Sequence, residues 1–422
     1  MSPTPRPVPT RRRLAPAWCR AAATIALVVS LAGACSGDDD RGGAPSTTTA
    51  TATTWPSLAG PAALPSPTVD PTPRWTAADL GLVDARDLTF VGDLAVVAGT
   101  DRPGTTDTTL VVVDAATGAE RWRLDSLSPL PDGSGTLWLP GVDGGLWVSS
   151  GAAVVVTRAA DRDGWGIAAL GLDDGAVRWH HGLVPVADDA PPSIVGADDA
   201  GVLVRALVPP HDGSGDTDED PEWSTVLLGG DGTPRWTAVG ARPQVLAPDL
   251  VVVDGAATAA AGGARIEALA RADGTSRWHL DDDAEPVAAT GSGATILTWG
   301  GGERGFEVLD GADGSVEAAF GPEVIGCRAG TDLVACTTVV GRDLHVVTHL
   351  AGETTPRTSG RAVDDRGEVG LAPGDAIVVG SALVDRSGNP LGAGLPGPAA
   401  AFGDGVVAVF DTPSTLAVHG LT

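Results

Sequence analysis

The stretch Val112–Trp122 reads V-V-D-A-A-T-G-A-E-R-W: an apolar run, a tight glycine turn, and a short segment ending in Arg-Trp. It is the first of several copies. Aligned on Gly118, the equivalent turn glycines are Gly175, Gly232, Gly274, Gly314, Gly352 and Gly388, at spacings of 57, 57, 42, 40, 38 and 36 residues. In the first four copies a tryptophan follows four residues after the glycine, namely Trp122, Trp179, Trp236 and Trp278; later copies have Ala318, Pro356 and Gly392 there.

Short runs rich in Val, Leu, Ala and Thr precede each turn glycine, for example 94–98 and 110–113. Such runs, bounded by Gly, Asp and Pro, are typical of β-strands. Four strands in a unit of about 40 residues is the spacing of a β-propeller blade. A helical solenoid would need long amphipathic stretches, and the sequence has none. We therefore predict an all-β propeller of four-stranded antiparallel blades.

The blade count depends on the two ends of the chain. Seven turn glycines indicate seven blades, yet strand-like runs continue at 399–402, 406–410 and 416–419, one strand short of a further blade. The tetrapeptide Pro73–Thr76 repeats Pro234–Thr237 residue for residue. We predict that Arg74 and Trp75 lie in the outer strand of an eighth blade, so that the ring closes between the termini and leaves no exposed sheet edge.

The repeat resembles the tryptophan-docking motif of PQQ-type propellers, A-x-D-x-x-T-G-x-E-x-W. The first copy matches it at Asp114, Thr117, Gly118, Glu120 and Trp122, with Val112 in place of the alanine. The second and fourth copies keep the alanine, as Ala169 and Ala268, with the glycine and the tryptophan. The third copy keeps only the glycine and the tryptophan. The resemblance implies that each tryptophan stacks on the turn glycine of a neighbouring blade, and the docking residues would be Gly118, Trp122, Gly175, Trp179, Gly232, Trp236, Gly274, Trp278 and Trp75.

The N-terminus is typical of an export signal: Arg11–Arg13, an apolar run over 21–34, and Leu31–Cys35, which resembles a bacterial lipobox. The apolar run is too short to span a bilayer of about 30 Å as a helix, which favours cleavage. We expect a signal peptide over 1–34, then a lipid-anchored Ser/Thr/Pro-rich linker over 35–72 that cannot bury enough surface to fold, and the propeller over 73–422. Cys35 is the predicted lipidation site, which places the domain on the extracytoplasmic face of the cell membrane; an ordinary secretory signal is the alternative.

The chain is acidic, with a formal net charge of -27 over 422 residues, and all its basic residues are arginine. Such a surface repels phosphate backbones, so nucleic-acid binding is disfavoured. Cys19 lies in the predicted signal and Cys35 is the lipid candidate, which leaves Cys327 and Cys336 on consecutive strand-like runs. We predict that these two form a cross-hairpin disulfide, contributing about 2.7 kcal/mol by loop-entropy arithmetic.

No catalytic constellation or cofactor motif stands out. The insertion 211–222 alternates acidic residues as a calcium loop does, but Pro221 and Leu227 occupy positions where that loop needs Gly and Glu, so we favour a solvated acidic loop and predict no metal site. The histidine pairs 180–181 and His345 with His349 lack the further ligands of a zinc set. The quinoprotein dehydrogenases that share the docking motif use an adjacent Cys-Cys pair, and this sequence has none.

Two functional hypotheses follow. In the first, the protein is a monomeric, non-catalytic scaffold without a cofactor, similar to the BamB-like lipoproteins that share this repeat and an eight-bladed ring. It would bind an unknown envelope protein or a cell-wall ligand. In the second, it is a PQQ- or sugar-dependent oxidoreductase whose site lies at the mouth of the propeller channel.

Overall fold

A computed structural model describes residues 68–421, apart from 106, 140–144, 160–163, 184–185, 187–189, 209–221, 256–264, 282–283, 302–303, 342, 354, 360–362, 364–368, 373–375, 386–388, 392–393 and 413–414. The chain divides into two units, 1–52 and 53–422, and everything described lies in the second. The predicted signal peptide, Cys35 and nearly all of the predicted linker are outside the described residues, as are Gly388 and most of the acidic insertion.

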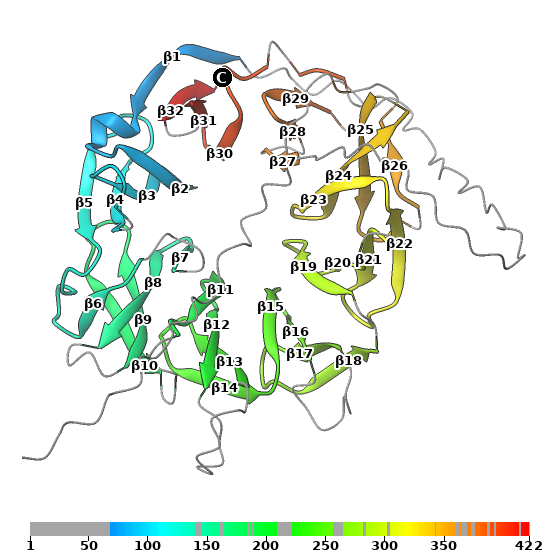
Figure 1. The fold of residues 1–422 in the computed structure, drawn as a ribbon, viewed down its shortest axis with the longest axis horizontal. Coiled ribbons are helices and arrows are strands. Elements are labelled where there is room, and N and C mark those ends of the chain that lie inside the picture. Colours follow the sequence, from blue (N-terminus) through cyan, green and yellow to red (C-terminus); the bar gives the residue numbers. More distant parts are fainter. Residues whose placement is uncertain are drawn as a thin grey trace, which may run out of the picture. The chain divides into compact units, whose positions relative to one another are not determined.

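Eight antiparallel sheets follow one another around a ring, so the predicted eight-bladed β-propeller is confirmed (Figure 1). Blades 1 to 4 contain the following strands, in chain order. Blade 1 is β2 (Asp84–Val91), β3 (Leu94–Thr100), β4 (Thr109–Asp114) and β5 (Glu120–Asp125). Blade 2 is β6 (Gly135–Leu137), β7 (Leu146–Val148), β8 (Ala152–Ala159), β9 (Trp165–Gly171) and β10 (Val177–Leu183). Blade 3 is β11 (Ser193–Asp198), β12 (Gly201–Val208), β13 (Glu222–Gly229) and β14 (Pro234–Val239). Blade 4 is β15 (Arg242–Leu246), β16 (Leu250–Asp254), β17 (Ile266–Ala270) and β18 (Ser276–Leu280).

The second half of the ring is built in the same way. Blade 5 is β19 (Glu285–Ala289), β20 (Thr295–Trp299), β21 (Phe306–Asp310) and β22 (Val316–Gly321). Blade 6 is β23 (Val324–Ala329), β24 (Leu333–Val340), β25 (Asp343–Leu350) and β26 (Arg357–Thr358). Blade 7 is β27 (Val369–Leu371), β28 (Ile377–Val379) and β29 (Ala382–Val384). Blade 8 is β30 (Ala399–Gly403), β31 (Val406–Thr412), β32 (Thr415–Leu421) and β1 (Val69–Thr76).

Two blades depart from four strands. In blade 2 the inner position is divided between β6 and β7, which both pair with β8, so this sheet has five strands. Blade 7 has three strands among the residues that the structure describes, and its turn glycine, Gly388, is outside them. The other six sheets have the four strands that the repeat predicts.

The first strand closes the ring. β1 pairs antiparallel with the last strand, β32, with Trp75 opposite Val418, so the N-terminal strand is the outer strand of blade 8 as predicted. The strand starts at Val69, four residues before the expected domain boundary. A short 3-10 helix, Ala77–Leu80, then leads into blade 1, and its start is fixed by Asp79, whose carboxylate accepts hydrogen bonds from the Thr76 amide and hydroxyl.

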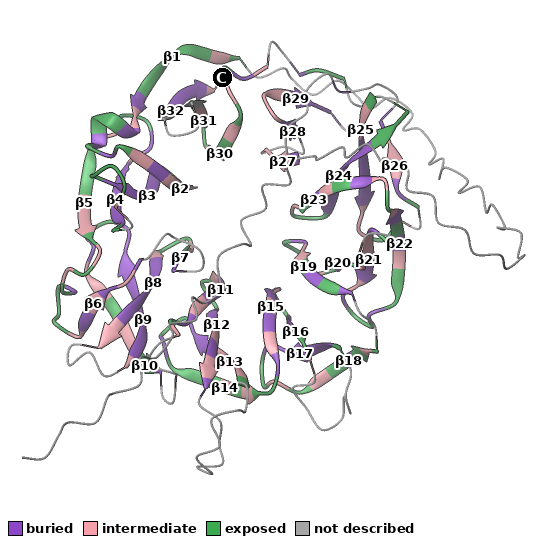
Figure 2. Ribbon diagram, in the orientation of Figure 1, coloured by how far each residue is buried: buried purple, intermediate pink, exposed green. Residues whose placement is uncertain are grey.

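The core is divided among the blade interfaces. Its eight apolar clusters each lie between two consecutive blades, as the purple, buried strand interiors in Figure 2 illustrate. Because every sheet is covered on both faces, its middle strands are continuously apolar: Leu94–Ala98 and Leu110–Val113 are buried. Stability therefore depends on how neighbouring blades are held together.

Each blade has two ends, which we name for later use. The first and second strands join at the turn end, where the third and fourth strands also join and where the repeat glycines lie; in blade 1, Leu94 pairs with both Val91 and Asp114 there. The second and third strands join at the opposite end, which we call the loop end. In Figure 1 the first strand is nearest the centre of the ring in every blade except blade 2, where β7 is nearest the centre.

Candidate functional site

Five tryptophans dock on the turn glycines of the next blade around the ring. Each indole Nε1 donates a hydrogen bond to a carbonyl two or three residues before that glycine: Trp75 to Ala115 (2.9 Å), Trp122 to Leu172 (2.7 Å), Trp179 to Gly230 (2.8 Å), Trp236 to Arg271 (3.0 Å) and Trp278 to Gly311 (2.9 Å). The glycines against which these rings lie are Gly118, Gly175, Gly232, Gly274 and Gly314. A buried indole joins two sheets by its apolar area while its N–H keeps a partner.

Gly118 shows why this position is glycine. Its φ is +70°, in the left-handed region that side chains disfavour, and an added Cβ would lie 2.7 Å from the Cγ of Trp75. Both the backbone turn and the close approach of the ring therefore require the absence of a side chain. Gly118 N–H also closes the turn by donating to the Asp114 carbonyl, at 2.8 Å.

The contact between blades 5 and 6 is made differently. Ala318 occupies the tryptophan position, and a Cβ on the turn glycine Gly352 would meet nothing within 4 Å. The neighbouring residue Glu317 reaches across instead: its carboxylate accepts the Gly352 amide and lies 3.9 Å from Nε2 of the fully buried His349. Burial raises the pKa of Glu317, while His349 acts in the opposite direction. At the interface of blades 5 and 6, the ionisable side chain of Glu317 thus makes the contact that a tryptophan makes elsewhere.

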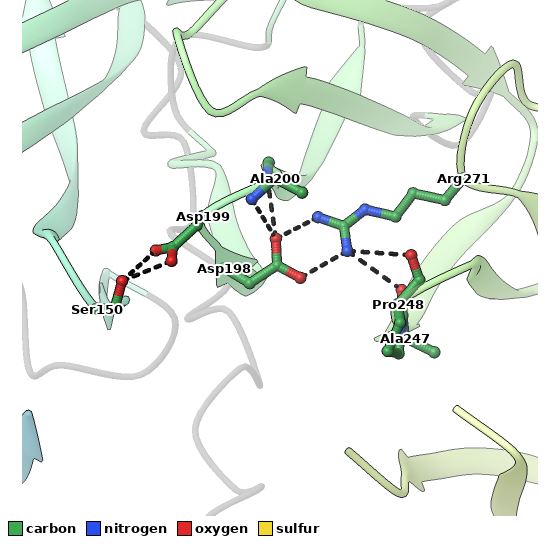
Figure 3. A network of polar contacts seen from close by, with 8 residues as sticks. Ser150, Asp198, Asp199, Ala200, Ala247, Pro248 and Arg271 are labelled. Atoms are coloured by element: carbon green, nitrogen blue, oxygen red, sulfur yellow. Dashed lines mark hydrogen bonds and ion pairs between the residues drawn. The ribbon is translucent and has the colours of Figure 1, made fainter. Parts of the chain in front are cut away.

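A polar network links blades 2, 3 and 4 at the turn end (Figure 3). Arg271, only 5% exposed, forms a two-pronged ion pair with Asp198, and its Nη1 also lies 3.4 Å from the carbonyls of Ala247 and Pro248. The neighbouring Asp199 accepts a hydrogen bond from Ser150 of blade 2, at 2.6 Å. Burial alone would raise the pKa of Asp198, but the Arg271 guanidinium and the amides of Ala200 and Gly201 together lower it. Since the Arg271 carbonyl also accepts a hydrogen bond from Trp236 of blade 3, this one turn residue makes two separate contacts across the interface of blades 3 and 4.

The predicted disulfide between Cys327 and Cys336 is confirmed. The two residues are direct partners in the antiparallel pairing of β23 with β24, and both are buried. The bridge lies in the core shared with blade 5, so its role is to stabilise blade 6.

The other candidate residues are partly accounted for. Within the part of the chain that the structure describes, there is no group of three or more His, Cys, Asp or Glu residues that could hold a metal ion. His345 Nδ1 donates to the Ser359 carbonyl, and His349 Nε2 donates to the Glu353 carbonyl. His180 forms a hydrogen bond with Thr157, at 3.0 Å. Among the same described residues, no helix is long and apolar enough to cross a membrane. Of the acidic insertion 211–222 considered for calcium, residues 211–221 are outside them.

The candidate site is a cavity of about 900 Å³ formed by blades 6, 7 and 8. Its walls come from the innermost strands β23, β27 and β30, together with the segment 395–398 that leads into blade 8. This volume lies in the range of small-molecule sites in proteins. The cavity adjoins the shortest blade, whose inner strand has only three residues, Val369–Leu371.

The chemistry of the lining is mainly apolar. Valine, leucine, alanine, proline and phenylalanine predominate, and Arg328 and Ser381 contribute the polar side chains of its described lining. A calcium-bound quinone does not fit these residues. Calcium takes oxygen ligands, chiefly carboxylates, and this described lining contains no carboxylate. The cavity suits an apolar group carrying a negative or polar end, which Arg328 could meet.

Sequence reasoning missed the residues that join blades by charge. Glu317 lies beside the position where a tryptophan was sought, and its only signal was the loss of that tryptophan. Arg271 occupies a turn position that holds Ala115, Leu172 and Gly311 in other copies, so an arginine there was a usable signal. Nothing in the sequence indicated the cavity, because the glycine, alanine and valine that line it are also common in ordinary β-strands.

Solved structures similar to this chain include β-propellers. BamB from Moraxella catarrhalis is 14% identical, with 80% of this chain and 83% of that chain covered and a TM-score of 0.35. A europium-containing methanol dehydrogenase is 12% identical, with 80% and 84% covered and a TM-score of 0.44. The β-propeller domain of the Trilobed protease from Pyrococcus furiosus is 11% identical, with 73% and 94% covered and a TM-score of 0.45. No protein-family model matches the sequence, and no curated protein matches it. At these identities the likeness concerns the fold alone.

Proposed function

We propose that the protein is a membrane-tethered, non-catalytic scaffold of the cell envelope, anchored through a lipid on Cys35 and binding its ligand or partner through the cavity of blades 6 to 8. The observation that carries this proposal is the composition of that cavity. Its described lining offers apolar surface and one guanidinium, but neither a carboxylate nor an imidazole to move protons.

The rest of the ring supports a binding role. Five of its tryptophans and the Arg271–Asp198 ion pair hold blades together, which gives a rigid frame for a recognition surface. The 33 residues from Ser36 to Thr68 could extend at most about 120 Å, so a lipid on Cys35 would leave the propeller free to meet other envelope components.

The test is crosslinking in cells from a defined position. A photo-reactive residue replacing Ala400, an exposed residue of the cavity lining, should give a discrete adduct, whereas the same residue at Val316, exposed on the outer strand of blade 5, should not. Arg328→Gln should weaken the adduct from position 400. Equal labelling from both positions would reject the cavity as the binding surface.

Two further measurements test the anchor and the non-catalytic role. Cys35→Ala should release the protein from membranes, and unchanged detergent-dependent fractionation would contradict the lipid anchor. Purified protein incubated with PQQ and calcium should acquire no chromophore and no dye-linked alcohol or sugar oxidation. If it acquires either, the oxidoreductase hypothesis replaces the scaffold.

A further inference from the structure

Two arginines from different blades lie over one tryptophan ring. Trp223 is on β13 of blade 3, and its ring centroid is 5.6 Å from the guanidinium carbon of Arg205 and 5.4 Å from that of Arg242. Arg205 is on the neighbouring strand β12, and Arg242 begins β15 of blade 4. We call these three residues the Arg-Trp-Arg cluster.

Strand pairing explains the arrangement. Trp223 is opposite Leu207, so Arg205, two residues away on the same strand, is its diagonal neighbour on the same face of the sheet. That face packs against blade 4, since a Cβ on Gly196 in blade 3 would lie 2.9 Å from the Cβ of Leu246 on β15. The cluster therefore lies at the interface of blades 3 and 4, toward the loop end.

Neither Arg205 nor Arg242 forms an ion pair with a carboxylate of the described residues, although Asp254 lies opposite Arg242 in the strand pairing. Eight described arginines of this acidic protein form ion pairs with Asp or Glu: Arg86, Arg102, Arg121, Arg123, Arg178, Arg271, Arg304 and Arg357. Within the part of the chain that the structure describes, Arg205 donates to the Ser193 hydroxyl, at 3.0 Å. Burial, followed by repulsion from Arg242, lowers the pKa of Arg205. Holding two guanidinium groups together without an anion costs free energy.

Further donors on β15 also lack partners among the described residues. The Nε of Arg242 and the Nε2 of Gln244, two residues along β15, are buried and make no hydrogen bond with any part of the chain that the structure describes. Unpaired buried donors are rare in folded proteins, because each forfeits its hydrogen bonds to water. The side chains that the structure places in contact here, Arg205, Ser193, Trp223 and Arg242, supply N–H and O–H donors, as an acceptor-binding site requires.

A second arginine in blade 2 makes a useful comparison. Arg158 lies 4.1 Å from the ring centroid of Trp165, but that tryptophan is only 3% exposed and packs edge-on against Trp138. Arg205, Trp223 and Arg242 all remain partly exposed. The two arrangements therefore differ in their ring: Trp223 is partly exposed, whereas Trp165 is buried.

We propose that the Arg-Trp-Arg cluster is an oxyanion-binding site that takes a phosphate or carboxylate group, with the two guanidinium forks as its principal donors. Planar guanidinium groups bind the paired oxygens of either group bidentately. The site is separate from the cavity of blades 6 to 8 and does not depend on it.

The test is calorimetric titration of the purified protein with sodium phosphate and with sodium acetate, at constant ionic strength against sodium chloride. At least one of the two, phosphate or acetate, should bind, with an affinity that falls as the salt concentration rises. The double variant Arg205→Gln/Arg242→Gln should weaken binding at least about tenfold, since each charge-assisted hydrogen bond is worth about a factor of ten or more. Binding of phosphate but not acetate, or the reverse, identifies the chemical class.

The matched control is Arg178→Gln/Arg357→Gln, which changes the net charge equally but removes two exposed arginines already paired with acids. It should bind as the wild type does. Arg205→Lys/Arg242→Lys keeps both charges, so it guards against a folding defect and should bind more weakly than the wild type but more tightly than the glutamine pair. Absence of binding by either oxyanion, or equal loss in the matched control, would overturn the proposal.

Discussion

Trp75 of the first strand donates its indole N–H to the carbonyl of Ala115 and lies over Gly118, which joins blade 8 to blade 1. The ring is 3% exposed, so Trp75→Ala would remove a large buried side chain at the closure of the propeller. We expect the variant to lose about 3 to 5 kcal/mol of unfolding free energy. Urea denaturation measures this loss. Trp299→Ala, at a tryptophan 43% exposed, is the control and should lose far less; equal losses would mean that Trp75 does not hold the closure.

Replacing a turn glycine has two costs, the strain of a left-handed backbone and a steric clash with a docked ring, and a comparison of Gly118 with Gly352 separates them. Both have positive φ, +70° and +80°, but a Cβ would strike the Trp75 ring at Gly118 and meet nothing within 4 Å at Gly352. Gly352→Ala should cost about 1 to 2 kcal/mol for the left-handed backbone. Gly118→Ala should cost about 1 to 3 kcal/mol more, because the ring must move. Thermal and urea unfolding of both variants check the difference, and equal destabilisation would contradict the close contact.

These two glycines also show how far the sequence could predict the structure. The Gly-to-Trp spacing recurs within single repeats, so the number of blades and the closure by Trp75 could be predicted from short segments. The disulfide could be predicted too, because its two cysteines lie on consecutive strands. The Arg271–Asp198 pair joins residues 73 apart in the chain, and the Arg-Trp-Arg cluster joins two blades. Such contacts depend on which face of its sheet each side chain occupies and on the rotation between blades. A β-bulge changes the face on which the following side chains lie. Bulges occur within β11 and β15, so alternation alone could not assign these side chains.

Asp198→Asn should make stability less dependent on acid. Arg271 holds the pKa of Asp198 below its usual value, so the folded state favours the ionised carboxylate. This contribution is present above the ordinary aspartate pKa of about 3.9 and is lost as pH falls through the lowered value. The variant should therefore be less stable than the wild type at pH 7, with the difference shrinking in acid. Urea unfolding at several pH values measures it. Asp199→Asn removes a charge beside the pair without touching Arg271, and an equal effect there would assign the loss to general charge.

Glu317 should give the opposite pH dependence. Burial raises its pKa, so the folded state retains the proton to higher pH than the unfolded chain does. Its contribution is therefore fully present below the ordinary glutamate pKa of about 4.3 and is lost as pH rises through the raised value. Glu317→Gln cannot ionise but can still accept the Gly352 amide. We expect this variant to gain stability relative to the wild type across that window.

Unfolding free energies of both proteins between acid and neutral pH measure the gain from Glu317→Gln. The control His349→Gln removes the neighbour that favours the ionised carboxylate, so it should steepen the decline in stability that accompanies ionisation of Glu317. Stability curves of wild type and Glu317→Gln that remain parallel over the whole range would show that Glu317 does not titrate with folding. The joint between blades 5 and 6 would then be held by apolar packing around Phe320 alone.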